Sequence, residues 1–232
     1  ASTSGSKLVD VRRNQEREVA SRSGIREECL RVHTIGQDCS VGKMLVAVEL
    51  TRALSARSVS TKFIATGQTG IIVEGDGCPI DCVVSDFVSG AVEKLILANQ
   101  HHDILMIEGQ GSLAHPRYSA VTLGLLHGCM PHGMILCYEA GRVGVNGLEH
   151  IGLKSLTELR EAYQTMANLM CPSEVIGVAV NSRLLTYEQA EAECRRVLDE
   201  LELPVCDVIR HGPGELVDAV LDLQRRRGLL GV

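Results

Sequence analysis

The stretch Gly36-Gln37-Asp38-Cys39-Ser40-Val41-Gly42-Lys43 decides the fold of this chain. A short predicted strand, Arg31–Ile35, precedes it, and the helical pattern of Gly42–Ala56 follows, with apolar residues at 46, 50, 53 and 54. In such a loop the backbone amides point inward, the helix N-terminus adds partial positive charge, and a lysine adds a full one. The sequence therefore predicts a phosphate-binding loop, in which Gly42 lets the ligand approach closely.

Two positions of the loop depart from the usual pattern, G-x-x-x-x-G-K-[ST]. Gln37 occupies the place of the first glycine, and Met44 replaces the Ser or Thr whose hydroxyl normally holds Mg²⁺. A glycine-rich turn with an exposed Lys43 is the alternative interpretation. We expect residues 36–44 to bind a phosphate-bearing cofactor, and the need for Mg²⁺ stays open.

Strand-like and helix-like segments alternate along the rest of the chain. Further strands are expected at 59–65, 103–107, 134–138, 175–180 and 204–209, and further helices at 84–95, 118–127, 156–170, 188–201 and 215–226. This order predicts one α/β domain over 32–232, with a mostly parallel sheet and helices on both faces. Because ligands bind at the carboxyl ends of such strands, we expect the polar residues that follow them to form one site.

Composition excludes several functions. The net charge of −6, with basic runs at the two ends, argues against a nucleic-acid partner. Nine cysteines at irregular spacing indicate reduced thiols, since no second Cys or His pair follows Cys78 and Cys82 at zinc-site spacing. No run reaches the ~18–20 apolar residues that span a bilayer. We therefore expect a soluble, cytoplasmic protein that does not bind a membrane.

Residues 1–31 differ from the remainder of the chain. They are small, polar or charged, and Ser and Gly interrupt them. Such a composition is typical of a linker, or of the remnant of an amino-terminal domain that this chain lacks.

Several short stretches carry a resemblance to known proteins. The loop together with Ile107-Glu108-Gly109-Gln110-Gly111 resembles the dethiobiotin synthetase group of P-loop proteins. A closer resemblance is to the carboxy-terminal domain of the D-glutamate N-acetyltransferase-like family, long catalogued as a domain of unknown function. It rests on the loop with its Met44, which is typical of that family, and on Ala65–Ile71, Glu108–Leu113, His115-Pro116 and Val121–Gly128.

The resemblance implies a P-loop NTPase-like domain that packs against a Rossmann-like amino-terminal domain. It implies transfer of an acetyl group from acetyl-CoA to the amine of D-glutamate or a related amino acid. The more distant resemblance implies instead a Mg/ATP-dependent kinase or ligase. A non-catalytic nucleotide-binding module is the third alternative. The cofactor at the loop is acetyl-CoA or ATP.

Lys43, Asp38 and Glu108 are the candidate catalytic residues. Glu108 ends a buried strand, where its carboxylate can hold a metal, act as a base or pair with Lys43. Acetylation of an amine needs a base, because only the neutral amine attacks a thioester. Asp38 is the other candidate base, or it is a turn residue that bonds its own loop amides.

Substrate contacts are expected after two other strands. Residues 66–70 suit a cradle of N–H groups for a carboxylate or phosphate, or form a plain loop. Arg117 suits a bidentate contact with a substrate carboxylate, or lies on the surface. Asn181 suits base recognition through its amide, or is a turn residue. The predicted substrate-binding set is Thr66, Gly67, Gln68, Thr69, Gly70, His115 and Arg117.

Two further expectations concern a thiol and a helix face. Cys39 lies in the loop near a helix N-terminus and Lys43, a setting that lowers the pKa of a thiol. An acetyl-thioester intermediate on Cys39 and simple loop packing are both compatible with this position. The apolar face of Leu216, Val220 and Leu223 is either core or a subunit interface, and we expect a homo-oligomer.

Overall fold

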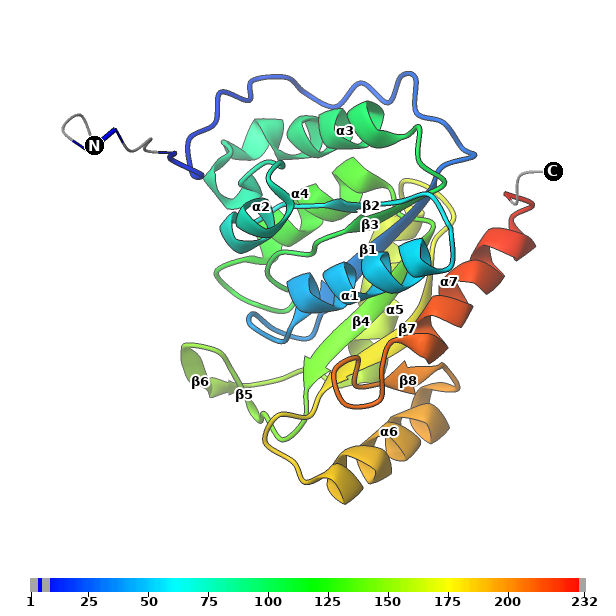
Figure 1. Cartoon of the computed structure of the whole chain (residues 1–232). Coiled ribbons are helices and arrows are strands. Elements are labelled where there is room, and N and C mark those ends of the chain that lie inside the picture. Colours follow the sequence, from blue (N-terminus) through cyan, green and yellow to red (C-terminus); the bar gives the residue numbers. More distant parts are fainter. Residues whose placement is uncertain (1–3, 6–8, 230–232) are drawn as a thin grey trace.

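The computed structural model describes residues 4–5 and 9–229. Within them lies a six-stranded sheet with the order β2-β3-β1-β4-β7-β8, in which every neighbouring pair is parallel (Figure 1). The strands are β1 (Leu30–Gly36), β2 (Thr61–Ile64), β3 (Ile104–Ile107), β4 (Gly133–Glu139), β7 (Glu174–Asn181) and β8 (Val205–Cys206). The predicted parallel α/β architecture is confirmed.

Helices cover both faces of this sheet. They are α1 (Lys43–Ala56), α2 (Gln68–Glu74), α3 (Val88–Asn99), α4 (Ser119–Cys129), α5 (Leu156–Asn168), α6 (Tyr187–Leu201) and α7 (Gly214–Arg226). α1 and α7 pack on one face, and α3, α4, α5 and α6 pack on the other (Figure 1). Among the described residues, no helix has both the length and the apolar character that crossing a membrane requires.

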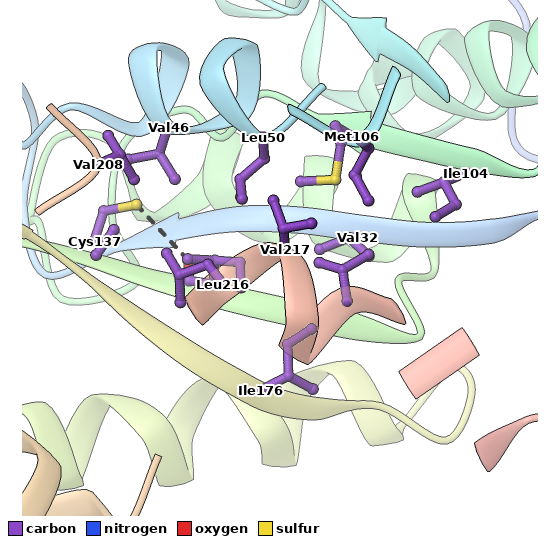
Figure 2. Packing of buried hydrophobic residues seen from close by; sticks show 14 of the residues in the cluster. Val32, Val46, Leu50, Ile104, Met106, Cys137, Ile176, Val208, Leu216 and Val217 are labelled. Carbon is purple, nitrogen blue, oxygen red and sulfur yellow. Dashed lines mark hydrogen bonds between the residues drawn. The ribbon is translucent and has the colours of Figure 1, made fainter. Parts of the chain in front are cut away.

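The largest apolar cluster lies between the sheet and the pair α1 and α7. Val32 of β1, Leu50 of α1 and Leu216 of α7 belong to this cluster (Figure 2), and all three are fully buried. Val220 and Leu223 of α7 belong to the same cluster. The apolar face of α7 is therefore core, so it does not supply the expected subunit interface, and the homo-oligomer stays a prediction.

The central position of β1 determines where a site can form. His33 of β1 lies opposite Ile107 of β3 on one side and Met134 of β4 on the other. Because the three strands run in the same direction, their carboxyl ends meet at one edge of the sheet. The loops that follow Gly36, Ile107 and Glu139 leave the sheet at this edge, where ligands of such folds bind.

β8 is shorter than the sequence predicts. The expected strand at 204–209 is reduced to Val205–Cys206. The carboxylate of Asp207 accepts hydrogen bonds from the amides of Ile209 at 2.9 Å and Arg210 at 3.1 Å. An aspartate that bonds the following amides turns the chain, and this turn ends the strand.

A short helix and a short hairpin occur where the sequence predicts loops. α2 begins at Gln68, directly after Gly67, so much of the stretch 66–70 is helical. After β4 the chain forms an antiparallel hairpin of β5 (Gly144–Val145) and β6 (Leu148–Gly152). The hairpin projects from the same edge of the sheet as the phosphate loop (Figure 1).

The segment 9–28 runs along α3 (Figure 1). The amides of Ser21 and Arg22 donate to the buried carboxylate of Glu93 at 2.8 and 2.9 Å. A Cβ on Gly90 would lie 2.0 Å from the backbone oxygen of Glu18, so the segment packs closely against the helix. Its role as a linker to a further domain stays a prediction.

Candidate functional site

The loop between β1 and α1 closes over the side chain of Lys43. Gly42 has φ 104°, a left-handed conformation that glycine adopts without strain. Lys43 is buried, and its Nζ donates to the backbone oxygen of Asp38 at 2.8 Å. A Cβ on Gly36 would lie 2.8 Å from that Nζ, so the glycine makes room for the lysine. The upstream placement of the first glycine therefore has a packing reason.

Arg142 fixes the outer side of this loop. Its guanidinium donates to the carbonyl oxygens of Cys39 at 2.7 Å and Ser40 at 3.5 Å. Within the described part of the chain, the amides of Ser40, Val41 and Gly42 donate to no protein acceptor. Unpartnered amides beside a lysine form a site that favours an anion.

The carboxylate of Asp38 holds three parts of the site together. One oxygen accepts from the amide of Cys39 at 2.7 Å. The other accepts from Arg142 at 2.9 Å and from the amide of Asn146, in the hairpin, at 2.7 Å. With both oxygens engaged, the carboxylate is poorly placed to take a proton from a substrate. These contacts favour the turn-residue interpretation of Asp38.

Glu108 follows β3, and its carboxylate lies at the start of α2. Its Oε2 accepts from the amides of Thr66 at 2.9 Å and Gly67 at 3.0 Å. A Cβ on Gly70 would lie 2.3 Å from that oxygen. Burial raises the pKa of Glu108, although the two amides and Lys43 act in the opposite direction. The predicted cradle of N–H groups thus holds a carboxylate of the protein itself.

A cleft of about 800 Å³ opens on these groups, a size typical of small-molecule sites. The predicted residues that line it are Cys39, Ser40, Val41, Gly42, Lys43, Met44, Gly67, Gln68, Thr69, Glu108 and Asn181. The predicted residues outside its lining are Gly36, Gln37, Asp38, Thr66, Gly70, His115 and Arg117. The structure thus brings the phosphate loop, the start of α2 and the ends of β3 and β7 together. Their ligand contacts stay predictions.

His115 and Arg117 lie beside the hairpin. His115 is buried, and its Nδ1 accepts from the amide of Arg117 at 3.2 Å. Its Nε2 lies 3.2 Å from the backbone oxygen of Asn146. The Arg117 side chain is exposed. These contacts give His115 a structural function, and the contact of Arg117 with a substrate carboxylate stays a prediction.

The cleft also contains residues that are not among the predicted site residues. Gln110, Asn146 and Arg183 line it. Gln110 donates to the hydroxyl of Thr66 at 3.2 Å. Gln110 belongs to the motif Ile107–Gly111, and Arg183 follows the end of β7, so each position carried a signal. Asn146 is placed by the hairpin, which no sequence motif predicts.

The loop residues themselves offer little to Mg²⁺. The side chain of Met44 has no oxygen, and both carboxylate oxygens of Asp38 accept protein hydrogen bonds. Glu108 accepts amide bonds at Oε2 alone, so its role as a metal ligand stays a prediction. Asp38, Cys39 and His115 place ligand atoms within 4.8 Å of one another. However, Nδ1 of His115 accepts an amide hydrogen, so a neutral ring carries its proton on Nε2, the nitrogen nearest Asp38. A metal would need that nitrogen deprotonated.

The expectation that the loop lowers the pKa of Cys39 is wrong. Burial raises this pKa, and the charge of Lys43 reduces the effect without reversing it. Because the thiolate is the nucleophile, a raised pKa makes Cys39 less reactive. The packing interpretation of Cys39 is therefore favoured over a thioester intermediate.

A parallel sheet whose central strand leads into a glycine loop, a buried lysine and a helix defines a P-loop NTPase-like domain. The chain belongs to the DUF1611 family, described as a domain of unknown function, through its carboxy-terminal P-loop domain, which matches residues 17–217.

Named relatives support this assignment. A D-glutamate N-acetyltransferase from Tritonibacter scottomollicae is 42% identical over 200 residues, which cover 85% of this chain and 60% of the relative. A protein of the same name from Pseudoalteromonas sp. is 38% identical over 213 residues, with coverage of 90% and 63%. The chain thus spans about 60% of the length of these curated relatives, and the resemblance seen in the motifs is confirmed.

Solved structures agree on the fold. A crystal structure of a DUF1611 family protein from Anabaena variabilis superimposes with a TM-score of 0.88 at 38% identity, covering 92% of this chain and 63% of that one. Cobyrinic acid a,c-diamide synthase from Mycobacterium smegmatis, solved with an ATP analog and magnesium, gives a TM-score of 0.54 at 14% identity, with coverage of 85% and 95%. At that identity the similarity shows the fold alone.

Proposed function

We propose that this domain binds acetyl-CoA at the loop 36–44 and takes part in transfer of its acetyl group to the amine of D-glutamate. One observation carries the proposal: Lys43 and Glu108 line the same cleft, a cation beside a buried carboxylate. The names of the curated relatives supply the two substrates. Because the chain spans about 60% of those relatives, we expect the rest of the longer protein to contribute to activity.

The loop suits the diphosphate of the coenzyme. The amides of Ser40, Val41 and Gly42 are available as donors, and Lys43 adds a positive charge at the same place. Nζ of Lys43 would exchange its bond to the Asp38 oxygen for a phosphate oxygen. Burial lowers the pKa of this lysine, and a bound anion would favour its charged form.

Glu108 suits the role of general base. Its raised pKa makes it a better proton acceptor than an exposed carboxylate, and its two amide bonds fix its position. The ammonium of D-glutamate would lose a proton to Glu108, and the neutral amine would attack the thioester carbonyl. The C–N bond forms as the C–S bond breaks, and the departing thiolate of coenzyme A takes up a proton.

The alternatives are a Mg/ATP-dependent kinase or ligase and a non-catalytic nucleotide-binding module. Phosphoryl transfer normally requires Mg²⁺ to bridge the phosphates. Met44 offers no hydroxyl for such a metal, and both carboxylate oxygens of Asp38 are engaged by protein donors. Acetyl transfer needs no metal, so it agrees better with the donors of this loop.

The decisive experiment is direct detection of N-acetylglutamate by mass spectrometry from acetyl-CoA and D-glutamate, with L-glutamate as a control. Direct detection is preferable to a thiol reagent, because the chain itself carries nine cysteines. The Tritonibacter scottomollicae protein serves as the full-length reference. Calorimetric titration of acetyl-CoA and ATP into this chain measures the binding step separately.

Glu108→Gln should slow acetyl transfer by roughly 10²–10⁴-fold while acetyl-CoA still binds. Lys43→Ala should weaken acetyl-CoA binding. The matched control is Glu161→Gln, on the exposed side of α5, which should change neither quantity. Equal rates for the Glu108 and Glu161 variants would contradict the role of Glu108, and binding of ATP without acetyl-CoA would favour the alternatives.

A further inference from the structure

Two cations lie at separate places in the cleft. Of the described residues that line it, Lys43 and Arg183 carry positive charge. Lys43 follows β1 and Arg183 follows β7, and β4 lies between these strands in the sheet. The strands β1 and β7 are therefore two strand spacings apart in the sheet, about 10 Å. A ligand that fills the cleft can therefore meet two distinct positive groups.

The guanidinium of Arg183 is held in a fixed orientation. Its Nε and Nη2 donate to one oxygen of Glu139 at 3.1 and 2.9 Å. Glu139 is buried, whereas 63% of the Arg183 side chain is exposed. A guanidinium has five N–H donors. Two of them bond Glu139, so the remaining donors are available to a ligand.

The same carboxylate connects Arg183 to the phosphate loop. Glu139 also pairs with Arg142, which donates to Asp38 and to the carbonyl oxygen of Cys39. The charges alternate in sign along this chain of contacts, and Arg183 is its exposed end. The loop and Arg183 are thus positioned relative to each other before any ligand binds, which reduces the ordering cost of binding.

We propose that Arg183 forms a second phosphate subsite, which recognises the 3′-phosphate on the ribose of coenzyme A. The proposal rests on the proposed function. Coenzyme A carries a diphosphate and, apart from it, a monophosphate, whereas ATP carries all its phosphates in one chain. The loop with Lys43 matches the diphosphate, and the free side of the Arg183 guanidinium matches the monophosphate through a bidentate pair.

The test is calorimetric titration of coenzyme A and 3′-dephospho-coenzyme A into the wild-type chain, Arg183→Gln and Arg183→Lys. Wild type should bind coenzyme A roughly tenfold or more tightly than the dephospho form. Arg183→Gln should bind the two equally, through weaker binding of coenzyme A alone. Arg183→Lys keeps the charge without the fork, so its ratio should lie between those two. Arg195→Gln, an exposed arginine paired on α6, should keep the wild-type ratio.

Three results would overturn the subsite. The first is equal wild-type affinity for the two coenzymes. The second is an equal loss of affinity for both in Arg183→Gln, which would place Arg183 against a part that the two share. The third is a reduced ratio in Arg195→Gln, which would indicate a non-specific charge effect. If neither coenzyme binds wild type, the proposed function fails as well, and that outcome is distinct from the other three. Thermal unfolding of each variant without ligand checks that it folds.

Discussion

Mild acid should destabilise this domain, because the buried side chain of His33 must stay neutral in the folded state. His33 lies in the middle of β1, fully buried, and neither ring nitrogen has a hydrogen-bond partner among the described residues. Burial, with a smaller effect of Lys43, lowers its pKa from 6.5 to about 3. His132 is also buried, and its pKa is likewise about 3, because of burial and the nearby charges of Arg31 and Arg227.

The direction of the pH effect follows from the protonation of His33 in the folded and unfolded states. The folded domain keeps His33 neutral, whereas the unfolded chain protonates it below about pH 6.5. The stability that depends on the neutral ring is therefore complete above pH 6.5 and is lost as the pH falls toward 3. Each pH unit in this window removes about 1.4 kcal/mol per histidine. At pH 5 the loss is about 2 kcal/mol for His33 and about as much again for His132.

Urea unfolding followed by circular dichroism, at pH 7.5, 6.5, 5.5 and 5.0, measures this loss. His33→Leu should lose about 2 kcal/mol less than wild type between pH 7.5 and 5. At pH 7.5 it should be at least as stable, because two unpartnered nitrogens are removed from the core. His150→Leu, at an exposed position in β6, is the control and should follow wild type. An identical loss in wild type and His33→Leu would refute the reasoning.

Two further predictions concern the loop and its neighbours. Gly109→Ala should destabilise the domain by about 3 kcal/mol or more, because its Cβ would lie 1.7 Å from the backbone oxygen of Thr34. The same change at Gly152, whose Cβ would meet no described atom within 4 Å apart from its chain neighbours, should alter the free energy of unfolding by less than about 1 kcal/mol. Cys39→Ala should keep its rate of acetyl transfer in the mass-spectrometric assay, since the thiol is held protonated. A complete loss of product with intact acetyl-CoA binding would restore the thioester intermediate.

Local patterns made the fold and the centre of the site predictable. The strand, the loop Gly36–Lys43 and the helix after it are contiguous, so their arrangement depends on short-range geometry. The position of Glu108 in the site could be predicted for a related reason. Parallel strands bring their carboxyl ends to one edge, so a carboxylate at the end of β3 must lie near the loop. The sequence therefore predicts which residues lie in the cleft. It predicts their hydrogen-bond partners less readily.

The remaining features depend on contacts between distant segments. Asp38 is engaged by Arg142 and by the amide of Asn146, more than 100 residues further along the chain. The pKa of Cys39 depends on burial, which a list of neighbouring charges does not reveal. Arg183 belongs to the site because Glu139, on another strand, holds it. None of these pairings has a signature in the spacing of the residues.

The packing of segment 9–28 on α3 sets a limit on where the domain can be trimmed. By composition a designer would cut near residue 31 and discard what precedes it. Such a cut would remove every donor that the structure gives to the carboxylate of Glu93, and it would expose the surface of α3 at Gly90, where the backbone of Glu18 packs. A shortened gene for crystallography or engineering should therefore start before residue 9, so that this outer layer of the helix is retained.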